Sequence, residues 1–510
     1  MCLDSDVTLG RLQFAPRAHY SSSKICSLGT RTEMIREIMD WCCDVGHQKT
    51  QVTLLTAVAG AGKSAVAHTI AHLCDERDIL LSCFFFRAGE TTSPDHLWSG
   101  VARSLAIRNK SYRRVLTSTL KKDPTIPTAA SDDQFKKLIL EPLRRIPPLD
   151  DTPLVIVIDA FDECDMDAST SLAELLRNSV SELPSSVKFF VTSRRTSVVN
   201  RYLLRHPSPI FHMTIHLSDD NNLEDCKIYI FSEVSKLKAL FPAIQADWPS
   251  DLEEMLAARA RGLFIWASAV MKYMKNQSVN PVVALNDLAL GVSQDVPAEE
   301  HLDALYTAIL KKCNWRDNSF KRNYPIVMGA IMIARSPLSI AAWDALLSPF
   351  LFPNTSLGDT ISELHPLLTG ADQRSTPIQL LHQSFRDYLR LRSASHVPIA
   401  LAPPKDQERL ALRCFQVINT EIPKVAGLGI IEKWGKRDVI PTIPQDEISG
   451  QLVYACRFGW DHLLEIQDVS EVLGIEIKKF LENFADWLEF CIRTEKYSSI
   501  LPLFDWIEVS

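Results

Sequence analysis

The chain has 510 residues, of which 46% are hydrophobic and 23% are charged. A chain of this length accommodates roughly three or four domains, and its composition is that of a globular protein with a sizeable core. The net charge of −7 argues against a nucleic-acid-binding protein that works through a global basic field.

The sequence carries no targeting or membrane signal that we recognise. The apolar stretch at residues 262–271 stops at Lys272, short of the length that spans a bilayer. The first ten residues contain Asp4 and Asp6 and no hydrophobic region, so we expect no secretory signal. The twelve cysteines form no CxxC pair, which favours reduced thiols. We therefore expect a cytoplasmic protein without a membrane span.

The first elements in chain order are a tail, a helix and a strand. Residues 1–23 are mixed and serine-rich, which predicts a loose tail. From Thr32 onward, apolar residues at helical spacing predict a helix. Residues 52–55 are typical of a short buried strand, and the apolar spacing after Ser64 predicts a second helix. The order of strand, glycine-rich turn and helix is that of a phosphate-binding loop.

The turn between that strand and helix reads AVAGAGKS at residues 57–64. Gly60 and Gly62 let backbone N–H groups curl around a phosphate, and the helix N-terminus adds a partial positive charge. Lys63 is expected to reach the β- and γ-phosphates, and the Ser64 hydroxyl to bind Mg²⁺. The predicted nucleotide contacts here are Gly60, Ala61, Gly62, Lys63, Ser64 and Ala65.

One position departs from the usual loop pattern, because Ala57 stands where a glycine is expected. An alanine forced to a positive φ costs about 1–2 kcal/mol. We therefore expect a weakened nucleotide affinity without loss of the site. The alternative interpretation is a Gly-Ala turn followed by a surface lysine.

A second motif follows the apolar run at residues 154–158, which predicts a parallel strand that is buried on both faces. Carboxylates at the carboxyl end of such a strand lie at the rim where open α/β sheets bind ligands. Asp159 is the candidate for holding Mg²⁺ through its hydration shell. Either Asp162 or Glu163 is the candidate for positioning or deprotonating an attacking water.

A third motif is the strand at residues 189–192, which is followed by Arg194. A guanidinium there can contact the γ-phosphate or stabilise its developing charge, and the alternative is that Arg194 only solvates the strand end. With a further strand at 80–86 and helices at 97–107 and 135–144, the pattern predicts a parallel α/β sheet. We place this domain at residues 24–215.

The rest of the chain is predominantly helical. Residues 216–300 predict an all-α domain, with helices at 225–237 and 252–274 that are apolar on one face. Residues 301–398 combine helices and a short strand in the order of a winged helix, and residues 399–510 form a C-terminal helical region. The candidate recognition helix of the winged helix, at 340–347, contains no Lys or Arg, so we expect it to pack against protein rather than to read DNA.

His382 lies at the junction between a short strand, at 377–382, and the following helix. The run from Ser384 to Asp387 predicts an N-cap with a capping-box partner. A histidine at such a junction can donate a hydrogen bond to an anion, but its residue pattern alone favours capping or packing.

Taken together, these motifs resemble the NACHT-type signal-transducing P-loop ATPases of the STAND class. The resemblance is to the fungal, NLR-like set with a nephrocystin-like nucleotide-binding module, and it extends from about residue 24 to the C-terminus. The motifs that carry it are CSLGTR at 26–31, AVAGAGKS at 57–64, CFFFR at 83–87, QFKKLILEPL at 134–143, VIVIDAFDEC at 155–164, FFVTSRR at 189–195, GLFIW at 262–266, LHQSFRDYL at 381–389 and LVYAC at 452–456. Ala160 after the magnesium aspartate is also typical of NACHT domains.

The resemblance implies roles for three further residues. In this family the winged-helix histidine lies against the β-phosphate of bound ADP and locks the closed, inactive form, and the matching residue is His382. The segment that contains Thr30 and Arg31 matches one near the adenine edge of the pocket. The resemblance also implies a homo-oligomer on activation.

We therefore predict an α/β P-loop NTPase domain followed by an all-α domain, a winged-helix-like domain and a C-terminal helical region. The predicted function is a signalling switch in fungal-type innate immunity or heterokaryon incompatibility. It binds ATP or ADP, or alternatively GTP, with Mg²⁺ and hydrolyses the triphosphate slowly. The predicted partners are the nucleotide, further copies of the chain and unidentified proteins, without nucleic acid.

Two other functions compete with the switch. A scaffold or regulatory paralogue with a weak or idle nucleotide site is suggested by Ala57. It is also suggested because neither an effector domain nor ankyrin or WD-type repeats are visible. A catabolic or remodelling P-loop enzyme would need a second substrate site, and the sequence offers none that we recognise.

Overall fold

The computed structural model describes residues 8–14, 19–44, 50–87, 94–149, 152–205, 209–242, 248–275, 282, 297–371, 373–391, 401, 403–429, 442–443 and 448–494. The chain divides into two compact units, Met1–Met271 and Lys272–Ser510. Each unit is described by itself.

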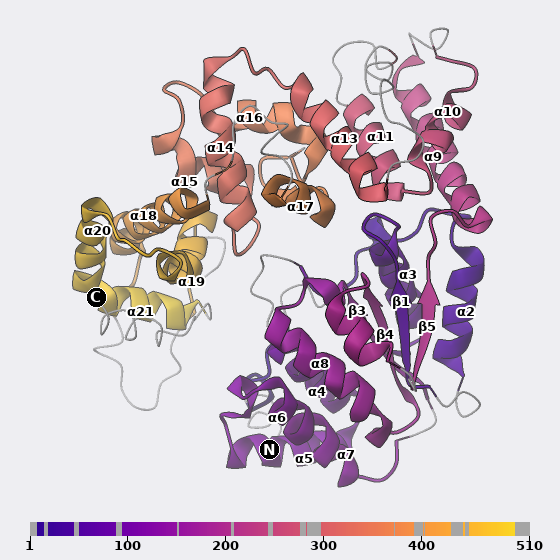
Figure 1. Ribbon diagram of the computed structural model, residues 1–510. Helices are drawn as coiled ribbons and strands as arrows, with labels where there is room; N and C mark the ends of the chain where they lie inside the picture. Colours follow the sequence, from indigo (N-terminus) through magenta and orange to yellow (C-terminus); the bar gives the residue numbers. More distant parts are fainter. Residues whose placement is uncertain are drawn as a thin grey trace. The chain divides into compact units, whose positions relative to one another are not determined.

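The first unit is built on a five-stranded parallel sheet with the strand order β2-β3-β4-β1-β5 (Figure 1). Its strands are β1 (Val52–Thr56), β2 (Leu80–Phe85), β3 (Leu154–Asp159), β4 (Val187–Ser193) and β5 (Ile210–Thr214). This confirms the predicted parallel sheet. The edge strand β5 was not predicted from the sequence.

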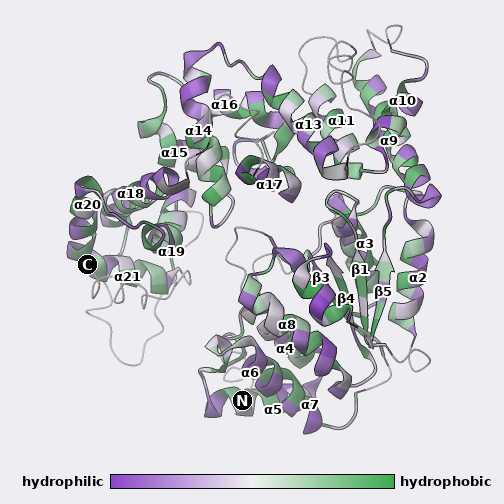
Figure 2. Ribbon diagram, in the orientation of Figure 1, coloured by the Kyte–Doolittle hydropathy of each residue, from purple (hydrophilic) through white to green (hydrophobic). Residues whose placement is uncertain are grey.

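Helices cover both faces of this sheet, so that its central strands are buried on both sides. Along β3, Val155 and Val157 join the core beneath α2 (Thr32–Cys43) and α3 (Lys63–Glu76). Ile156 and Ile158 join the core on the opposite face, beneath α4 (Asp95–Arg108) and α8 (Met166–Asn178). This alternation is the two-residue period of a strand, and both faces are apolar because both are covered. In Figure 2 the central strands are coloured mainly as hydrophobic.

The other helices of the first unit lie around the sheet and after it. They are α4 (Asp95–Arg108), α5 (Lys110–Lys122), α6 (Ser131–Gln134), α7 (Glu141–Arg144), α8 (Met166–Asn178), α9 (Asp220–Leu240), α10 (Leu252–Ala260) and α11 (Phe264–Lys275). The unit also contains two π-helical stretches, Phe135–Leu140 and Val199–Leu203, and short 3-10 helices. The boundary between the two units falls within α11.

The N-terminal segment differs from the loose tail that we predicted. Leu9 and Leu12 are buried in the same core as α4, and the Arg103 guanidinium of α4 donates a hydrogen bond to the Leu12 carbonyl oxygen. The burial of these leucines offsets the entropy of ordering the segment. At least this part of the predicted tail belongs to the first unit.

The second unit is mainly helical. Its elements are α13 (Ala298–Lys312), α14 (Asn318–Ile333), α15 (Ile340–Leu347), α16 (Leu357–Leu364), β6 (Leu368–Thr369), β7 (Gln379–Leu380), α17 (Gln383–Leu391), α18 (Pro403–Glu421), α19 (Gly450–Leu464), α20 (Glu471–Glu482) and α21 (Phe484–Arg493). Strands β6 and β7 pair antiparallel. Helix α15, the candidate recognition helix, is largely buried and packs on α16, α18 and α19.

None of the helices in the described part of the chain combines the length and the apolar composition needed to cross a bilayer.

Candidate nucleotide-binding site

The candidate site lies at the carboxyl edge of the sheet in the first unit. Strand β4 lies between β1 and β3, so the ends of all three strands meet at one rim. Thr56 of β1 pairs with Ser193 of β4, and Ile158 of β3 pairs with Val191. The register therefore brings together the three motifs that the sequence analysis singled out, as expected for the ligand-binding rim of an open α/β sheet.

The phosphate loop turns sharply at two glycines. Gly60 has a φ of +80° and Gly62 a φ of +94°, and Gly62 is the N-cap of α3. A Cβ on Gly60 would lie 2.0 Å from Cγ2 of Ile265 in α11, so both conformation and space require glycine there. The loop therefore has the shape of a backbone cradle for an anion at the start of a helix.

Ala57 does not carry the strain that we predicted for it. It is not among the described residues with a positive φ, and its N–H continues the sheet by donating to the Ser193 carbonyl oxygen at 3.3 Å. Because its backbone extends β1 instead of turning, alanine fits here without the cost of a left-handed conformation. The reason for expecting a weakened affinity is thereby removed.

Lys63 folds back over the loop that precedes it. Its Nζ donates to the carbonyl oxygens of Ala57 and Val58, at 3.1 and 3.0 Å. Burial lowers the pKa of Lys63, and the nearby Asp162 carboxylate opposes that shift. A partly desolvated ammonium group at the mouth of an anion cradle is suited to bind phosphate oxygens.

Asp159 lies at the end of β3 and is buried. It accepts hydrogen bonds from the hydroxyls of Thr192 and Ser64. Burial raises the pKa of Asp159, while these two hydrogen bonds favour its charged form. The sequence analysis did not identify Thr192 as a partner of Asp159. Its position near the carboxyl end of β4, the neighbour of β3, could have indicated this contact.

This pair of oxygen ligands fits a magnesium ion. Ser64 is exposed and bonded directly to Asp159, so one hydroxyl and one carboxylate lie side by side beside the phosphate loop. Mg²⁺ in nucleotide sites keeps several waters and takes few protein ligands. The described residues hold no group of three or more His, Cys, Asp and Glu suited to a metal.

Asp162 and Arg194 bind each other. Arg194 Nε lies 3.1 Å from Asp162 Oδ2, and the Arg194 N–H donates to Oδ1 at 2.8 Å. The Ser193 hydroxyl also contacts Asp162, at 3.4 Å. Asp162 therefore fixes the end of β4 and the Arg194 side chain. Glu163, its neighbour in the short helix Phe161–Glu163, is half-buried at the same rim.

Arg31 is buried and has partners that the sequence did not indicate. Its guanidinium donates to the carbonyl oxygen of Ala61, in the phosphate loop, at 2.9 Å, and to Asn222 of α9. It also pairs with Asp225 at 3.7 Å and lies over the Phe264 ring, 5.0 Å from its centroid. The place of Arg31 near the adenine edge of a nucleotide, which the resemblance implied, stays a prediction. Burial lowers the pKa of Arg31, and Asp225 opposes that shift.

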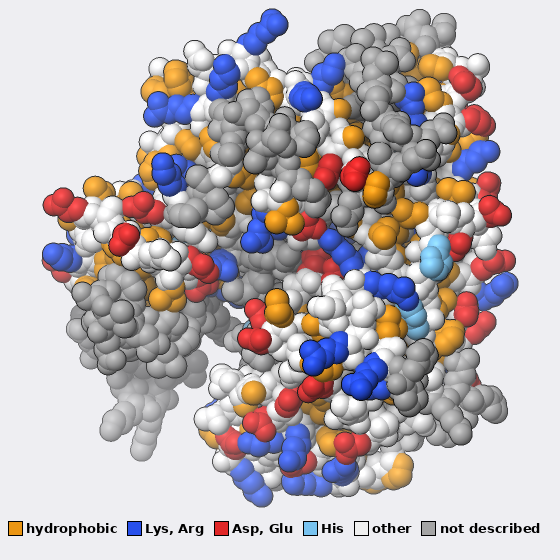
Figure 3. All heavy atoms as spheres, in the orientation of Figure 1, with side chains coloured by type: hydrophobic (Ala, Val, Ile, Leu, Met, Phe, Trp, Pro, Cys, Tyr) orange, Lys and Arg blue, Asp and Glu red, His pale blue; other side chains and the backbone are white. Residues whose placement is uncertain are grey.

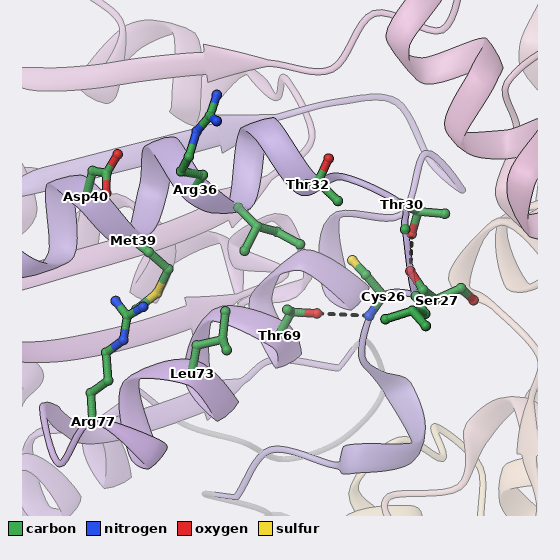
Figure 4. Close-up of a pocket in the computed structure, with 13 residues that line it drawn as sticks. Cys26, Ser27, Thr30, Thr32, Arg36, Met39, Asp40, Thr69, Leu73 and Arg77 are labelled. Atoms are coloured by element: carbon green, nitrogen blue, oxygen red, sulfur yellow. Dashed lines mark hydrogen bonds between the residues drawn. The ribbon is translucent and has the colours of Figure 1, made fainter.

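Thr30 faces a separate cavity of about 400 Å³ between α2 and α3 (Figure 4). Its hydroxyl donates to the Ser27 carbonyl oxygen at 2.7 Å, and the Thr69 hydroxyl accepts from the Cys26 N–H at 2.8 Å. The lining also includes Leu73 and Arg77, but no residue of the phosphate loop. Thr30 therefore lines this cavity, and its place near the adenine edge of a nucleotide stays a prediction.

His382 belongs to the second unit and caps α17. Its Nδ1 accepts from the Ser384 N–H at 3.0 Å and contacts the Ser384 hydroxyl at 2.8 Å. The histidine itself therefore caps the helix, and the predicted Ser384 N-cap is wrong. An Nδ1 that accepts places the proton of a neutral ring on Nε2. The contact between His382 and a nucleotide stays a prediction.

The fold and the site together define the class: the first unit is a P-loop nucleotide-binding domain of the NTPase type. Residues 29–194 match the family described as "Nephrocystin 3, N-terminal". This match covers the phosphate loop and ends at Arg194, so it includes the site and leaves the second unit outside. No curated protein gives a significant match to the chain.

Solved structures with distant similarity include Cdc6p of Pyrobaculum aerophilum and Drosophila ORC bound to DNA. The first has 13% identity and a TM-score of 0.31, and the match covers 74% of this chain and 93% of that one. The second has 13% identity and a TM-score of 0.35, with 69% and 92% covered. Neither likeness is close enough to assign a site or a function.

Proposed function

We propose that this chain is a nucleotide-operated switch that binds ATP or ADP with Mg²⁺ and hydrolyses the triphosphate slowly. The observation that carries the proposal is the meeting of the phosphate loop, Asp159 and Arg194 at one rim of the sheet. Phosphoryl transfer needs a backbone cradle for the phosphates, a carboxylate for Mg²⁺ and a cation near the γ-phosphate. The phosphate loop, Asp159 and Arg194 are the candidates for these three roles.

The proposed division of roles follows from the contacts. The loop N–H groups and Lys63 bind the phosphates, and Ser64 and Asp159 would hold Mg²⁺, which neutralises phosphate charge when bound. Asp162 forms an ion pair with the Arg194 side chain and accepts a hydrogen bond from the Arg194 backbone N–H. Glu163 is therefore the better candidate for accepting a proton from the attacking water.

The switch itself requires the two nucleotides to differ in their contacts. A γ-phosphate near Arg194 distinguishes ATP from ADP, and His382 is proposed to bind the β-phosphate of ADP through Nε2. Release of that contact would permit oligomerisation. The family resemblance extends this proposal to signalling in fungal-type innate immunity or heterokaryon incompatibility.

The idle-scaffold alternative loses its main support, because Ala57 is not in a strained conformation. DNA binding is not proposed either, since α15 is largely buried and contains no Lys or Arg. On the described part of the face in Figure 3, acidic and basic side chains of the first unit are interspersed, without a broad basic field.

Calorimetric titration with ADP and Mg²⁺ tests the proposal. Wild-type protein is expected to bind, and Lys63→Ala to lose at least about tenfold in affinity, because charge-assisted phosphate contacts are lost. Lys110→Ala, at an exposed position of α5, is the matched control and should bind like wild type. Absence of binding by the wild-type protein, or equal binding by Lys63→Ala, would contradict the proposal.

A further inference from the structure

Two carbonyl groups of the phosphate loop are held from outside the loop. The Gly60 carbonyl oxygen accepts from the Ile265 N–H at 3.2 Å, and the Ala61 carbonyl oxygen accepts from the Arg31 guanidinium at 2.9 Å. Ile265 lies in the first turn of α11, and Arg31 precedes α2. Residues far apart in the sequence therefore fix two consecutive peptide groups of the loop.

Fixing a carbonyl also fixes the next N–H. In a planar trans peptide, the C=O of one residue and the N–H of the next point in opposite directions. The bonds to Gly60 and Ala61 therefore turn the N–H groups of Ala61 and Gly62 away from Ile265 and Arg31. Successive N–H groups that point to one side form the nest that binds a phosphate.

One side chain joins this loop to the helices that follow the sheet. Besides Ala61, the Arg31 guanidinium contacts Asn222 and Asp225 of α9 and lies over the Phe264 ring of α11. Arg31 also has a φ of +59° as the N-cap of α2. Such a conformation is costly for a non-glycine residue and persists where the surroundings over-determine it.

The start of α11 packs closely against the start of α9. A Cβ on Gly262, just before α11, would lie 2.2 Å from Asn222 Nδ2 and 2.5 Å from the Leu217 carbonyl oxygen. The Asn222 amide in turn donates to the carbonyl oxygens of Leu217 and Gly262, at 2.8 and 3.2 Å. Asn222 is thus both a partner of Arg31 and the residue that holds the start of α11.

We propose that Arg31 is a positioning residue that couples the phosphate loop to the helices α9–α11. Through the Ala61 carbonyl it presets the Gly62 N–H for a phosphate, and through Asn222 and Asp225 it holds α9 to the loop. Coupling between two sites is reciprocal, so an anion bound in the loop tightens α9–α11. This inference rests on the proposed nucleotide site and names how that site regulates its neighbouring helices.

The test is Arg31→Lys, which keeps the charge and loses the planar fork that reaches several acceptors. Two quantities are measured on the full chain: ADP affinity with Mg²⁺ by calorimetry, and hydrogen exchange of α9–α11 with and without ADP. In wild type, ADP should slow exchange in these helices. In Arg31→Lys, affinity should fall about tenfold or more and the slowing should disappear.

Two further variants keep the test decisive. Arg114→Lys, at an exposed position of α5, is the matched control and should behave like wild type. Asp225→Asn is a milder change at the same contact and should shift both quantities in the same direction as Arg31→Lys. If Arg31→Lys does not fold, Asp225→Asn provides the test in its place.

The inference is overturned if Arg31→Lys binds ADP as tightly as wild type and retains the slowed exchange. A wild-type chain that binds no nucleotide contradicts the proposed function instead. In that case the coupling is tested by hydrogen exchange without ligand. Faster exchange of α9–α11 in Arg31→Lys than in wild type supports the coupling, and equal exchange overturns it.

Discussion

At the scale of single residues, Ala57 shows how backbone conformation decides the effect of a substitution. Because Ala57 is buried and extends β1, a glycine there would add freedom to the unfolded chain without relieving strain. We expect Ala57→Gly to lower the free energy of unfolding by about 0.5–1 kcal/mol and to leave ADP affinity unchanged. Denaturant unfolding and calorimetry measure the two effects. A clear gain in affinity would show that our account of the loop is wrong.

The acidic pair after β3 gives a second residue-scale prediction. Glu163→Gln removes the proposed proton acceptor, so ATP hydrolysis should fall by roughly 10²–10⁴ while ADP affinity stays near that of wild type. A phosphate-release assay under single-turnover conditions measures the rate.

Asp162→Asn serves as the comparison, because it weakens the contact that orients Arg194. It should lower ATP affinity more than ADP affinity, since only ATP carries a γ-phosphate. If Asp162→Asn abolishes hydrolysis and Glu163→Gln does not, the two roles are the reverse of those assigned here.

At the scale of elements, helix α3 carries a buried histidine, His68, from which we expect the first unit to be sensitive to acid. His68 stacks on Phe85 with ring centroids 4.1 Å apart, and its Nδ1 accepts from the Ser21 N–H at 3.2 Å. Burial lowers the pKa of His68 to about 3. Between that value and the ordinary value of 6.5, the unfolded chain binds a proton that the folded chain excludes.

Stability should therefore fall as the pH drops below about 6.5, with a limiting slope of about 1.4 kcal/mol per pH unit. His68→Gln keeps an acceptor for the Ser21 N–H and removes the titration, so its melting temperature should change less than that of wild type between about pH 7 and about pH 5. His72→Gln, one turn further along α3, is the control. An identical pH dependence in wild type and His68→Gln would refute the assignment.

The helices and strands also show which sequence patterns were sufficient to predict an element. Apolar runs predicted the central strands because those strands are buried on both faces. Strand β5 was missed because it pairs only with β1 and carries polar residues such as His212 and Thr214. The predicted helix at 252–274 is two helices, α10 and α11. They are separated where Arg261 and Gly262 both take a positive φ.

At the scale of the whole molecule, local motifs located the phosphate loop, Asp159, Asp162 and Arg194, because each follows a strand that could be recognised. The role of Arg31 could not be predicted in this way, because its partner Asn222 lies 191 residues further along the chain. Contacts of that kind follow from the fold and leave no local pattern.

The central proposal is that the phosphate loop holds a nucleotide and that His382 contributes to its retention. The most direct measurement is mass spectrometry of the nucleotide released from purified wild type, His382→Ala and Lys63→Ala. The account predicts near-stoichiometric ADP in wild type and little in either variant. Equal ADP in wild type and His382→Ala, or no nucleotide in wild type, would contradict it.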